Sequence, residues 1–203
     1  MAGRILWDVD TQVDFMEPSG KLYVPGANDV APAMERLVDA ARAAGLVHVA
    51  SADDHELTDP EISDAPDYAT TYPPHCLRGT QGAEKIPETR QADPVPLALT
   101  EVPEKWLRGR EFLLLKKHFD VFTNPNADRL LERFDPQEVV VFGVATDVCD
   151  DAAIRGLLAR GRTVTFVEEA SRGLDESRTA ACLGAWRDTG VRFATVDEVV
   201  AGL

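Results

Sequence analysis

The strongest constraint in this sequence is the regular alternation of short apolar runs with segments of helical periodicity. The most continuous run, residues 138–144, is typical of a strand buried on both faces of a parallel sheet. Between such runs, apolar side chains recur at three- and four-residue spacing, which predicts helices. We therefore expect an α/β fold, a mostly parallel, doubly wound sheet of about six strands with helices on both faces.

The expected elements form one domain over residues 1–203. Asn28 is expected to cap the first long helix, and Gly45 is expected to end it. Prolines and turn-forming residues crowd residues 57–105, which predicts a long functional loop region at about 53–105. Strands are expected at residues 3–8, 46–50, 111–116, 138–144, 163–167 and 191–195, and later helices at 127–134, 147–160, 176–188 and 196–201.

Composition excludes several classes of protein. The chain carries 21 basic and 35 acidic residues, a formal net charge of −14, which disfavours binding to nucleic acid or to an anionic membrane surface. No apolar run approaches the roughly 20 residues that span a bilayer, and the first residues show no signal-peptide core. Three cysteines cannot form a disulfide framework, so a reducing, cytoplasmic location is expected.

Several chemically active side chains fall at or just after the expected ends of four strands. They are Asp10, Asp53, His55, Lys116 and Cys149. In parallel α/β sheets, ligands bind beyond the carboxyl ends of the strands. We therefore expect these five side chains to converge on one edge of the sheet.

Cys149 is the candidate nucleophile. It lies just inside an expected helix, where unpaired N–H groups and the helix dipole lower the pKa of a thiol and stabilise an oxyanion. No histidine has an evident place beside it, so activation would fall to the carboxylate of Asp10 and the cation of Lys116. Taken singly, each residue has a simpler explanation. Cys149 would be a small buried side chain, Asp10 would cap a turn, and Lys116 would be a surface charge at a strand end. Cys182 lies on an expected helix beside Ala180 and Ala181, and its side chain is expected to serve in packing.

A group of histidines and acids in the loop region has the donor types of a metal site. Asp53 and His55, two apart in an extended segment, point to the same side, and Asp54 then faces away. With Glu61 and His75 they offer nitrogen and oxygen donors that suit zinc, iron or manganese. Acid-rich loops are common in so acidic a chain, and spacing alone fits a solvated loop equally well.

Three motifs together resemble the nicotinamidases of the isochorismatase-like cysteine hydrolases, over Ile5 to about Gly173. The first is an aspartate after a strand followed by Gln-x-Asp-Phe, found at Asp10–Phe15. The second is the catalytic lysine in Lys-x-x-aromatic-x-x-aromatic, which fits Lys116 better than Lys117. The third is the nucleophile motif Gly-Val-x-Thr-Asp-x-Cys, at Gly143–Cys149.

The nicotinamidase branch adds a metal site with Asp-x-His and a histidine in Pro-Pro-His-Cys, which match Asp53, His55 and His75. The fourth ligand position, often histidine, aligns with Glu61, so the metal preference can differ. The resemblance implies one divalent transition metal, zinc first, with iron or manganese as alternatives. A second departure is Asp150, whose charge would oppose thiolate formation if it faced the site.

The resemblance also implies an activity, the deamidation of nicotinamide to nicotinate and ammonia in NAD salvage. Cys149 would form a thioester, with Asp10 accepting its proton and Lys116 stabilising the thiolate. The backbone N–H groups of Ala145 and Cys149 would hold the oxyanion, aimed by a cis peptide between Val144 and Ala145. The metal would bind the pyridine nitrogen, and relatives form homo-oligomers. The candidates to sandwich the ring are Phe15 and Tyr72.

Other functions remain open at this stage. Related hydrolases of N-carbamoyl compounds or maleamate keep the Asp, Lys and Cys but generally lack the metal set, so metal content separates them. Isochorismatases cleave a vinyl ether and lack the nucleophilic cysteine. A non-catalytic interaction subunit with a vestigial site would show no reactive thiol.

Overall fold

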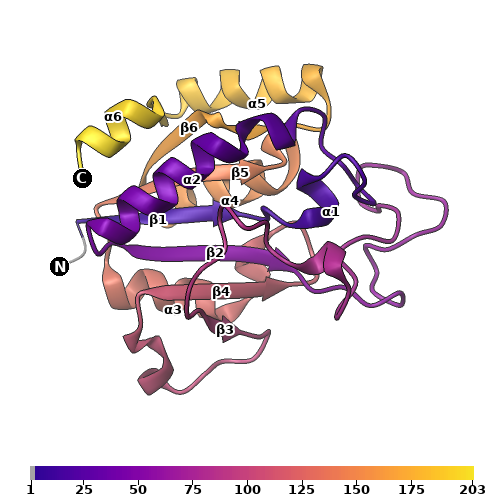
Figure 1. Ribbon diagram of the computed structural model, residues 1–203, viewed down its shortest axis with the longest axis horizontal. Helices are drawn as coiled ribbons and strands as arrows, with labels where there is room; N and C mark the ends of the chain where they lie inside the picture. Colours follow the sequence, from indigo (N-terminus) through magenta and orange to yellow (C-terminus); the bar gives the residue numbers. More distant parts are fainter. Residues whose placement is uncertain (1–2) are drawn as a thin grey trace.

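The computed structural model describes residues 3–203, which form a sheet of seven parallel strands with helices on both faces (Figure 1). The strand order is β3-β4-β2-β1-β5-β6-β7. This confirms the predicted α/β class. The strands are β1 (Arg4–Val9), β2 (Val47–Asp53), β3 (Val95–Leu97), β4 (Glu111–Lys116), β5 (Glu138–Val144), β6 (Thr163–Arg172) and β7 (Arg192–Phe193).

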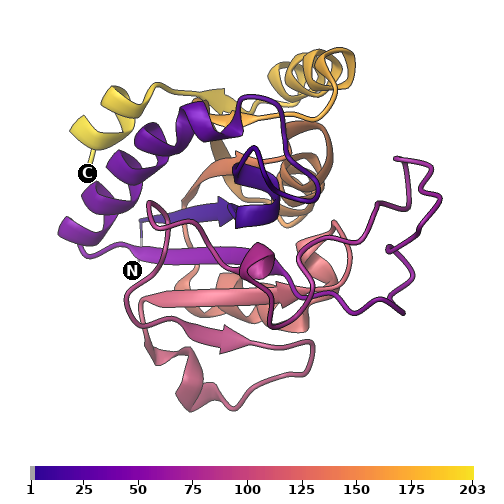
Figure 2. The same ribbon diagram turned by 45° about the vertical axis from the view of Figure 1, so that its right-hand side comes forward.

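Two separate apolar cores explain why helices cover both faces. Side chains of α2 and α6 pack in one core, whereas side chains of α3, α4 and α5 pack in the other. Figure 2 shows α2 and α6 together on the near side of the sheet. The helices are α1 (Val13–Met16), α2 (Ala27–Ala43), α3 (Pro125–Phe134), α4 (Asp151–Ala159), α5 (Glu176–Asp188) and α6 (Val196–Ala201).

The structure corrects the predicted number of strands. The sheet has seven strands rather than about six because β3 lies inside the segment predicted as loop. It has only three residues with Pro96 at the centre, and it pairs with β4 alone at the sheet edge, where proline is tolerated. A strand so short gives no readable periodicity.

The helix starts also differ from prediction. Gly26, with φ of 75°, precedes α2, so the predicted cap at Asn28 is wrong. Gly45 follows α2 in a left-handed conformation, as predicted. The helix predicted from residue 147 begins instead as a π-helical turn, η4 (Thr146–Asp150), before α4. Such turns are frequent at functional sites.

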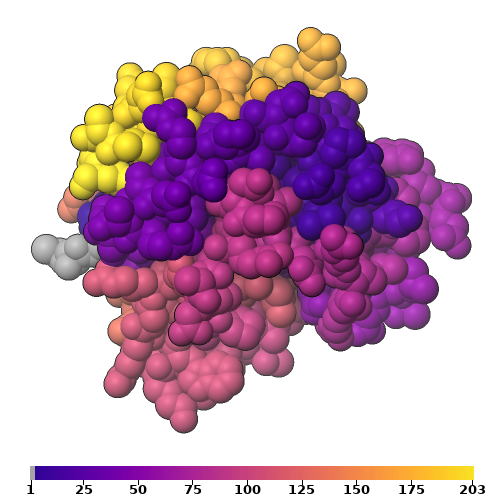
Figure 3. Space-filling view, in the orientation of Figure 1, coloured from indigo at the N-terminus to yellow at the C-terminus, as the bar shows by residue number. Residues whose placement is uncertain are grey.

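The long loop region is fastened to the rest of the molecule. Gln12 pairs with Lys85 in an isolated bridge, and the amide of Ile86 donates to the carbonyl of Thr11. In the space-filling view, chain from this region lies directly beside α2 (Figure 3). Among residues 3–203, no helix is long and apolar enough to cross a membrane.

The topology determines where a ligand can bind. β1 pairs in parallel with β2 on one side and with β5 on the other, so the chain runs outward from β1 in both directions. A crevice forms at the carboxyl ends of strands at such a switch point. The loops that follow β1, β2, β4 and β5 therefore supply the candidate site.

Candidate active site

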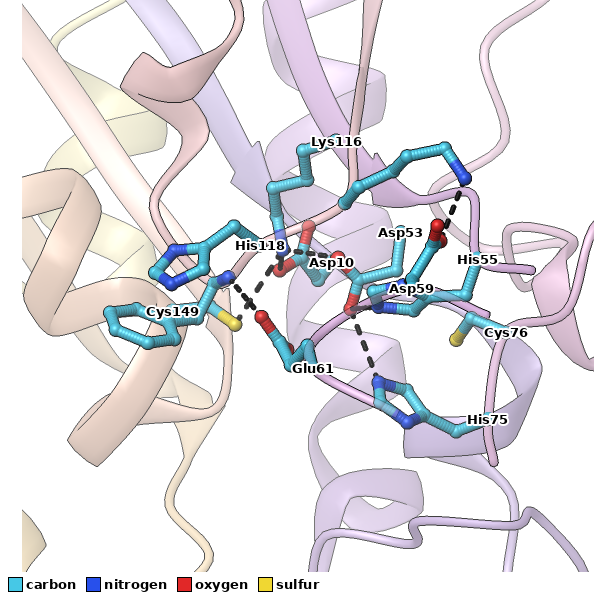
Figure 4. A network of polar contacts seen from close by, with 12 residues as sticks. Asp10, Asp53, His55, Asp59, Glu61, His75, Cys76, Lys116, His118 and Cys149 are labelled. Atoms are coloured by element: carbon cyan, nitrogen blue, oxygen red, sulfur yellow. Dashed lines mark hydrogen bonds and ion pairs between the residues drawn. The ribbon is translucent and has the colours of Figure 1, made fainter. Parts of the chain in front are cut away.

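Four strand ends bring the predicted catalytic side chains together (Figure 4). Asp10 directly follows β1 in a left-handed conformation with φ of 49°. Asp53 and Lys116 are the last residues of β2 and β4, and β-pairing places them side by side. Cys149 lies in η4, after β5. All four are buried.

Lys116 is the centre of this group. Its Nζ atom lies 2.8 Å from Asp10 Oδ2, 2.5 Å from Asp53 Oδ1 and 3.8 Å from Cys149 Sγ. Lys117 points elsewhere, with its Nζ 2.7 Å from Asp59 Oδ2. The structure therefore places Lys116, and not its neighbour, between the acids and the thiol.

Two hydrogen-bonding side chains support these aspartates, one at a carboxylate and one at the backbone, and sequence reasoning gave them no role. Ser51 Oγ donates to Asp10 Oδ1 over 2.7 Å. The side-chain amide of Gln12 makes two hydrogen bonds to the backbone of Asp53. Its Nε2 donates to the Asp53 carbonyl over 2.8 Å, and its Oε1 accepts from the Asp53 N–H over 2.7 Å. Gln12 thereby ties the end of β1 to the end of β2. Only the fixed Gln in the Asp-x-Gln motif hinted at this.

Burial and charge set the protonation of the group. Burial raises the pKa of the Cys149 thiol well above its ordinary value, and Asp10 adds to this while Lys116 opposes it. Burial also raises the pKa of Asp10, despite Lys116. For Lys116, burial works against charge, but the adjacent carboxylates raise its pKa well above the usual value. The resting site therefore holds a thiol, with a permanent cation beside it.

Asp150 is buried immediately after the nucleophile. Its side chain is fully buried, and neither carboxylate oxygen has a hydrogen-bond partner among residues 3–203. Burial, reinforced by the negative charge of Asp10, raises its pKa well above the ordinary value. The raised pKa favours the protonated form of Asp150, in which it would not oppose the Cys149 thiolate.

Asp150→Asn should make stability less dependent on pH. A raised native pKa means that the folded state binds a proton that the unfolded chain releases above about pH 4, so stability falls as pH rises towards the folded pKa. One such group contributes a slope of at most about 1.4 kcal/mol per pH unit. The unfolding free energy measured in urea at pH 5 and pH 8 should differ less in the variant. An equal difference in both proteins would mean that Asp150 is ionised.

The predicted metal ligands form one buried group. Each of Asp53, His55, Glu61 and His75 offers a ligand atom within 4.8 Å of the others. The Nε2 atoms of His55 and His75 lie 3.7 and 3.5 Å from Asp53 Oδ2. His55 Nε2 is buried without a hydrogen-bond partner. An unpartnered imidazole nitrogen facing two carboxylates fits a divalent cation of the borderline class, such as zinc.

A second layer of contacts orients these ligands. His55 Nδ1 lies 3.3 Å from Asp59 Oδ2, and His75 Nδ1 lies 2.7 Å from the carbonyl of Pro73, so both rings turn Nε2 towards Asp53. The backbone N–H of Phe119 donates to Glu61 over 2.9 Å. Such contacts fix the ring orientation of metal ligands. Nothing in the acid-rich loop singled out Asp59 from sequence alone.

His55→Ala should reduce the metal content of the purified protein. The substitution removes one of four donors and the unpartnered nitrogen, so affinity should fall by at least about 10–100-fold, the effect of disturbing even an outer contact. Elemental analysis after dialysis against metal-free buffer measures it. Asp54→Ala is the matched control, because Asp54 pairs outward with Arg78. Unchanged metal content in His55→Ala would refute this ligand assignment.

A small pocket is lined by residues of both groups. Cys149 lies on one side of it, and three of the metal-type residues line it as well. Phe15 and Tyr72, the candidates for ring contacts, both line the pocket. Burial raises the pKa of Tyr72 to about 12, so this wall is a neutral phenol. The other walls are apolar, formed by Leu22, Val24, Ala145, Val148 and Leu174.

The backbone before the nucleophile has the expected form. The peptide between Val144 and Ala145 is cis. Ala145 lines the pocket beside Cys149, and its carbonyl accepts from the N–H groups of Val148 and Asp150. The π-helical turn thus places the Cys149 side chain and the backbone of Ala145 on the same cavity.

The fold and this set of side chains define an enzyme of the cysteine hydrolase class. The chain belongs to the isochorismatase domain family, whose model matches residues 5–198. It is 30% identical over 194 residues to the nicotinamidase/pyrazinamidase of Mycobacterium tuberculosis, covering 94% of this chain and 97% of the relative. It is 26% identical to the nicotinamidase of Escherichia coli, covering 86% and 85%.

The solved structures show the same architecture. The crystal structure of the pyrazinamidase of Pyrococcus horikoshii in complex with zinc superimposes with a TM-score of 0.75 at 22% identity. The match covers 95% of this chain and 99% of the other. At this identity the likeness shows the shared fold.

Proposed function

We propose that this protein is a metal-dependent nicotinamidase, which hydrolyses nicotinamide to nicotinate and ammonia in NAD salvage. The observation that carries the proposal is that Cys149 and three of the metal-type residues (Asp53, Glu61 and His75) line one narrow pocket. A flat ring with a nitrogen at one end and a carboxamide at the other can reach both groups at once. The relatives named nicotinamidase support the same substrate.

The residues that would hold the metal are Asp53, His55, Glu61 and His75, with zinc the first candidate. When bound, the ion supplies Lewis acidity to the ring nitrogen and so orients and polarises the substrate. The ring would lie between Phe15 and Tyr72. Aromatic contacts of this kind contribute about 0.5–1.5 kcal/mol beyond burial, enough to orient a ring.

The chemical steps belong to the side chains of the chain itself. Asp10 takes the proton of Cys149, and Lys116 stabilises the thiolate as the sulfur attacks the carboxamide carbon. Backbone N–H groups of Ala145 and Cys149 hold the oxyanion. Asp10 then returns the proton to the departing ammonia, which leaves a thioester. A water molecule activated by Asp10 hydrolyses the thioester and releases nicotinate.

The pocket offers little to the alternative substrates. Maleamate and N-carbamoyl amino acids carry a carboxylate, which needs a cationic partner. No arginine or lysine is among the described residues that line this pocket, whereas two acids are. An uncharged aromatic amide fits these walls better than an anion.

An assay of ammonia release from a panel of amides tests the proposal. Nicotinamide should be hydrolysed fastest, ahead of N-carbamoylsarcosine and maleamate, and a chelator should abolish the activity. Added zinc, iron or manganese should restore it. Preference for an anionic amide, or full activity after the metal has been removed, would contradict the proposal.

A further inference from the structure

One guanidinium group connects two segments that each contribute residues to the pocket. Arg178 of α5 donates from Nε to Asp147 Oδ2 over 3.0 Å and from Nη1 to the carbonyl of Tyr68 over 3.0 Å. Asp147 belongs to η4, the turn that carries Cys149. Tyr68 belongs to the loop that carries Tyr72. Arg178 therefore joins the nucleophile turn to the loop that forms the opposite wall.

The Asp147 end of this connection is rigid. The Asp147 side chain is fully buried, and its Oδ1 accepts from the N–H of Leu174 over 2.7 Å. Its Oδ2 also accepts from the N–H of Asp175 over 3.2 Å. Leu174 itself lines the pocket. Asp147 thus holds both the guanidinium of Arg178 and the backbone of Leu174, which forms part of one apolar wall.

The Tyr68 end is a turn with its own internal support. The Asp67 carboxylate accepts from the backbone N–H groups of Ala69, Thr70 and Thr71 at 2.8–2.9 Å. Tyr68 has a left-handed backbone with φ of 55°, which residues with side chains rarely adopt. Its ring meets Tyr72 edge-on, with centroids 6.3 Å apart. The placement of Tyr68 is therefore passed on to Tyr72, in the pocket wall.

We propose that Arg178 is a positioning residue that sets the width of the pocket mouth and so restricts the site to single-ring substrates. The part of this proposal that concerns single-ring substrates rests on the proposed function, whereas the part that concerns the width of the pocket mouth does not. Without Arg178, the turn at Tyr68 loses its only described hydrogen bond to α5, and the Tyr72 ring loses the support of a fixed Tyr68 on its outer side, although the Tyr72 backbone stays bonded to Glu61 and Ser63. The pocket then admits larger groups and holds a single ring less well.

Alkylation of Cys149 by two reagents of different size tests the width of the mouth directly. The background is Cys182→Ala, because Cys182 is partly exposed and would react with either reagent, whereas Cys76 is fully buried. Arg178→Ala should speed the reaction with fluorescein maleimide about tenfold, the size expected from losing one charge-assisted hydrogen bond. The rate with iodoacetamide should be unchanged. The KM for nicotinamide should rise by a similar factor, with a smaller change in kcat.

Two further variants complete the test. Asp67→Ala, at an exposed position, dissolves the turn that presents the Tyr68 carbonyl and should have the same effect as Arg178→Ala. Arg155→Ala is the matched control, because Arg155 is an exposed arginine of α4 that pairs only with Asp151 of its own helix. It should behave as wild type.

Three results would overturn the proposal. They are wild-type reactivity of Arg178→Ala towards the large reagent, an equal response of Arg155→Ala, and equal slowing of both reagents. The last result would mean that Arg178 acts on the nucleophile turn through Asp147. If the wild-type protein does not hydrolyse nicotinamide, the proposed function fails, while the alkylation rates still decide the role of Arg178.

Discussion

Replacing Cys149 by alanine should lower the rate of ammonia release from nicotinamide by about 10⁴-fold or more, the scale seen when a nucleophile acting as a unit with its partners is removed. Among the described residues, Cys149 is the only cysteine that lines the pocket, so the thiol nucleophile is lost entirely. The ion pairs of Lys116 with Asp10 and Asp53 do not depend on the sulfur. The variant should therefore fold, with an unfolding free energy within about 1 kcal/mol of wild type.

Cys182→Ala is the control for this experiment. Cys182 is on α5, away from the pocket, so this variant should keep full activity. Mass spectrometry after a short incubation with substrate should trap an acyl adduct on Cys149 in the wild type and none in Cys149→Ala. Substantial turnover by a folded Cys149→Ala protein would remove Cys149 from the mechanism.

Lys116→Ala should lower kcat about 10³-fold and also destabilise the protein. The thiolate loses the cation that lies 3.8 Å from its sulfur, and the expected loss of rate is like that of losing an oxyanion donor, about 10²–10³-fold. The carboxylates of Asp10 and Asp53 lose their common partner, and breaking a buried pair in this way costs about 3–5 kcal/mol. Iodoacetamide should alkylate Cys149 more slowly near neutral pH, because the pKa of the thiol rises further. Circular dichroism identifies the temperatures at which the variant is folded.

Lys117→Ala distinguishes the two adjacent lysines. Lys117 pairs with Asp59, which contacts His55, so its loss should weaken metal retention without slowing alkylation of Cys149. The two variants are therefore told apart by different measurements. Lys116→Ala should change the reactivity of the thiol, and Lys117→Ala should change the metal content. If alkylation of Cys149 were slower in Lys117→Ala but not in Lys116→Ala, Lys117 rather than Lys116 would be the residue that activates the thiol.

The catalytic group and the metal-type group share one side chain, Asp53. Asp53 faces the histidines through Oδ2 and Lys116 through Oδ1. Burial by itself would raise the pKa of the Asp53 carboxyl group. The charge of Lys116 and the hydrogen bonds of the two histidines outweigh burial and hold this pKa well below the ordinary value. A single carboxylate thus balances the cation of the catalytic group and offers an oxygen to a metal. Changes at Asp53 should affect both thiol reactivity and metal retention.

Much of this arrangement could be read from the sequence. Periodicity alone gave the alternating strands and helices, because burial on both faces of a parallel sheet demands continuous apolar runs such as residues 138–144. The rule for parallel sheets then placed Asp10, Asp53, Lys116 and Cys149 at one edge. The metal-type set could be named because its donor types suit a metal and because Asp53, His55 and His75 match motifs of the nicotinamidase branch, whereas spacing alone fitted a solvated loop equally well.

Tertiary structure alone decided the rest, because it depends on contacts between residues far apart in the chain. Short β3 exists only because β4 offers it a partner, and the pKa of Asp150 is raised because burial excludes water from its carboxyl group. Arg178 gave no signal in sequence, since an exposed arginine on a helix is ordinary until its partners are known. Local pattern specifies which side chains are buried and which strands form, whereas the distances and charges that tune a site arise only when the strand ends meet.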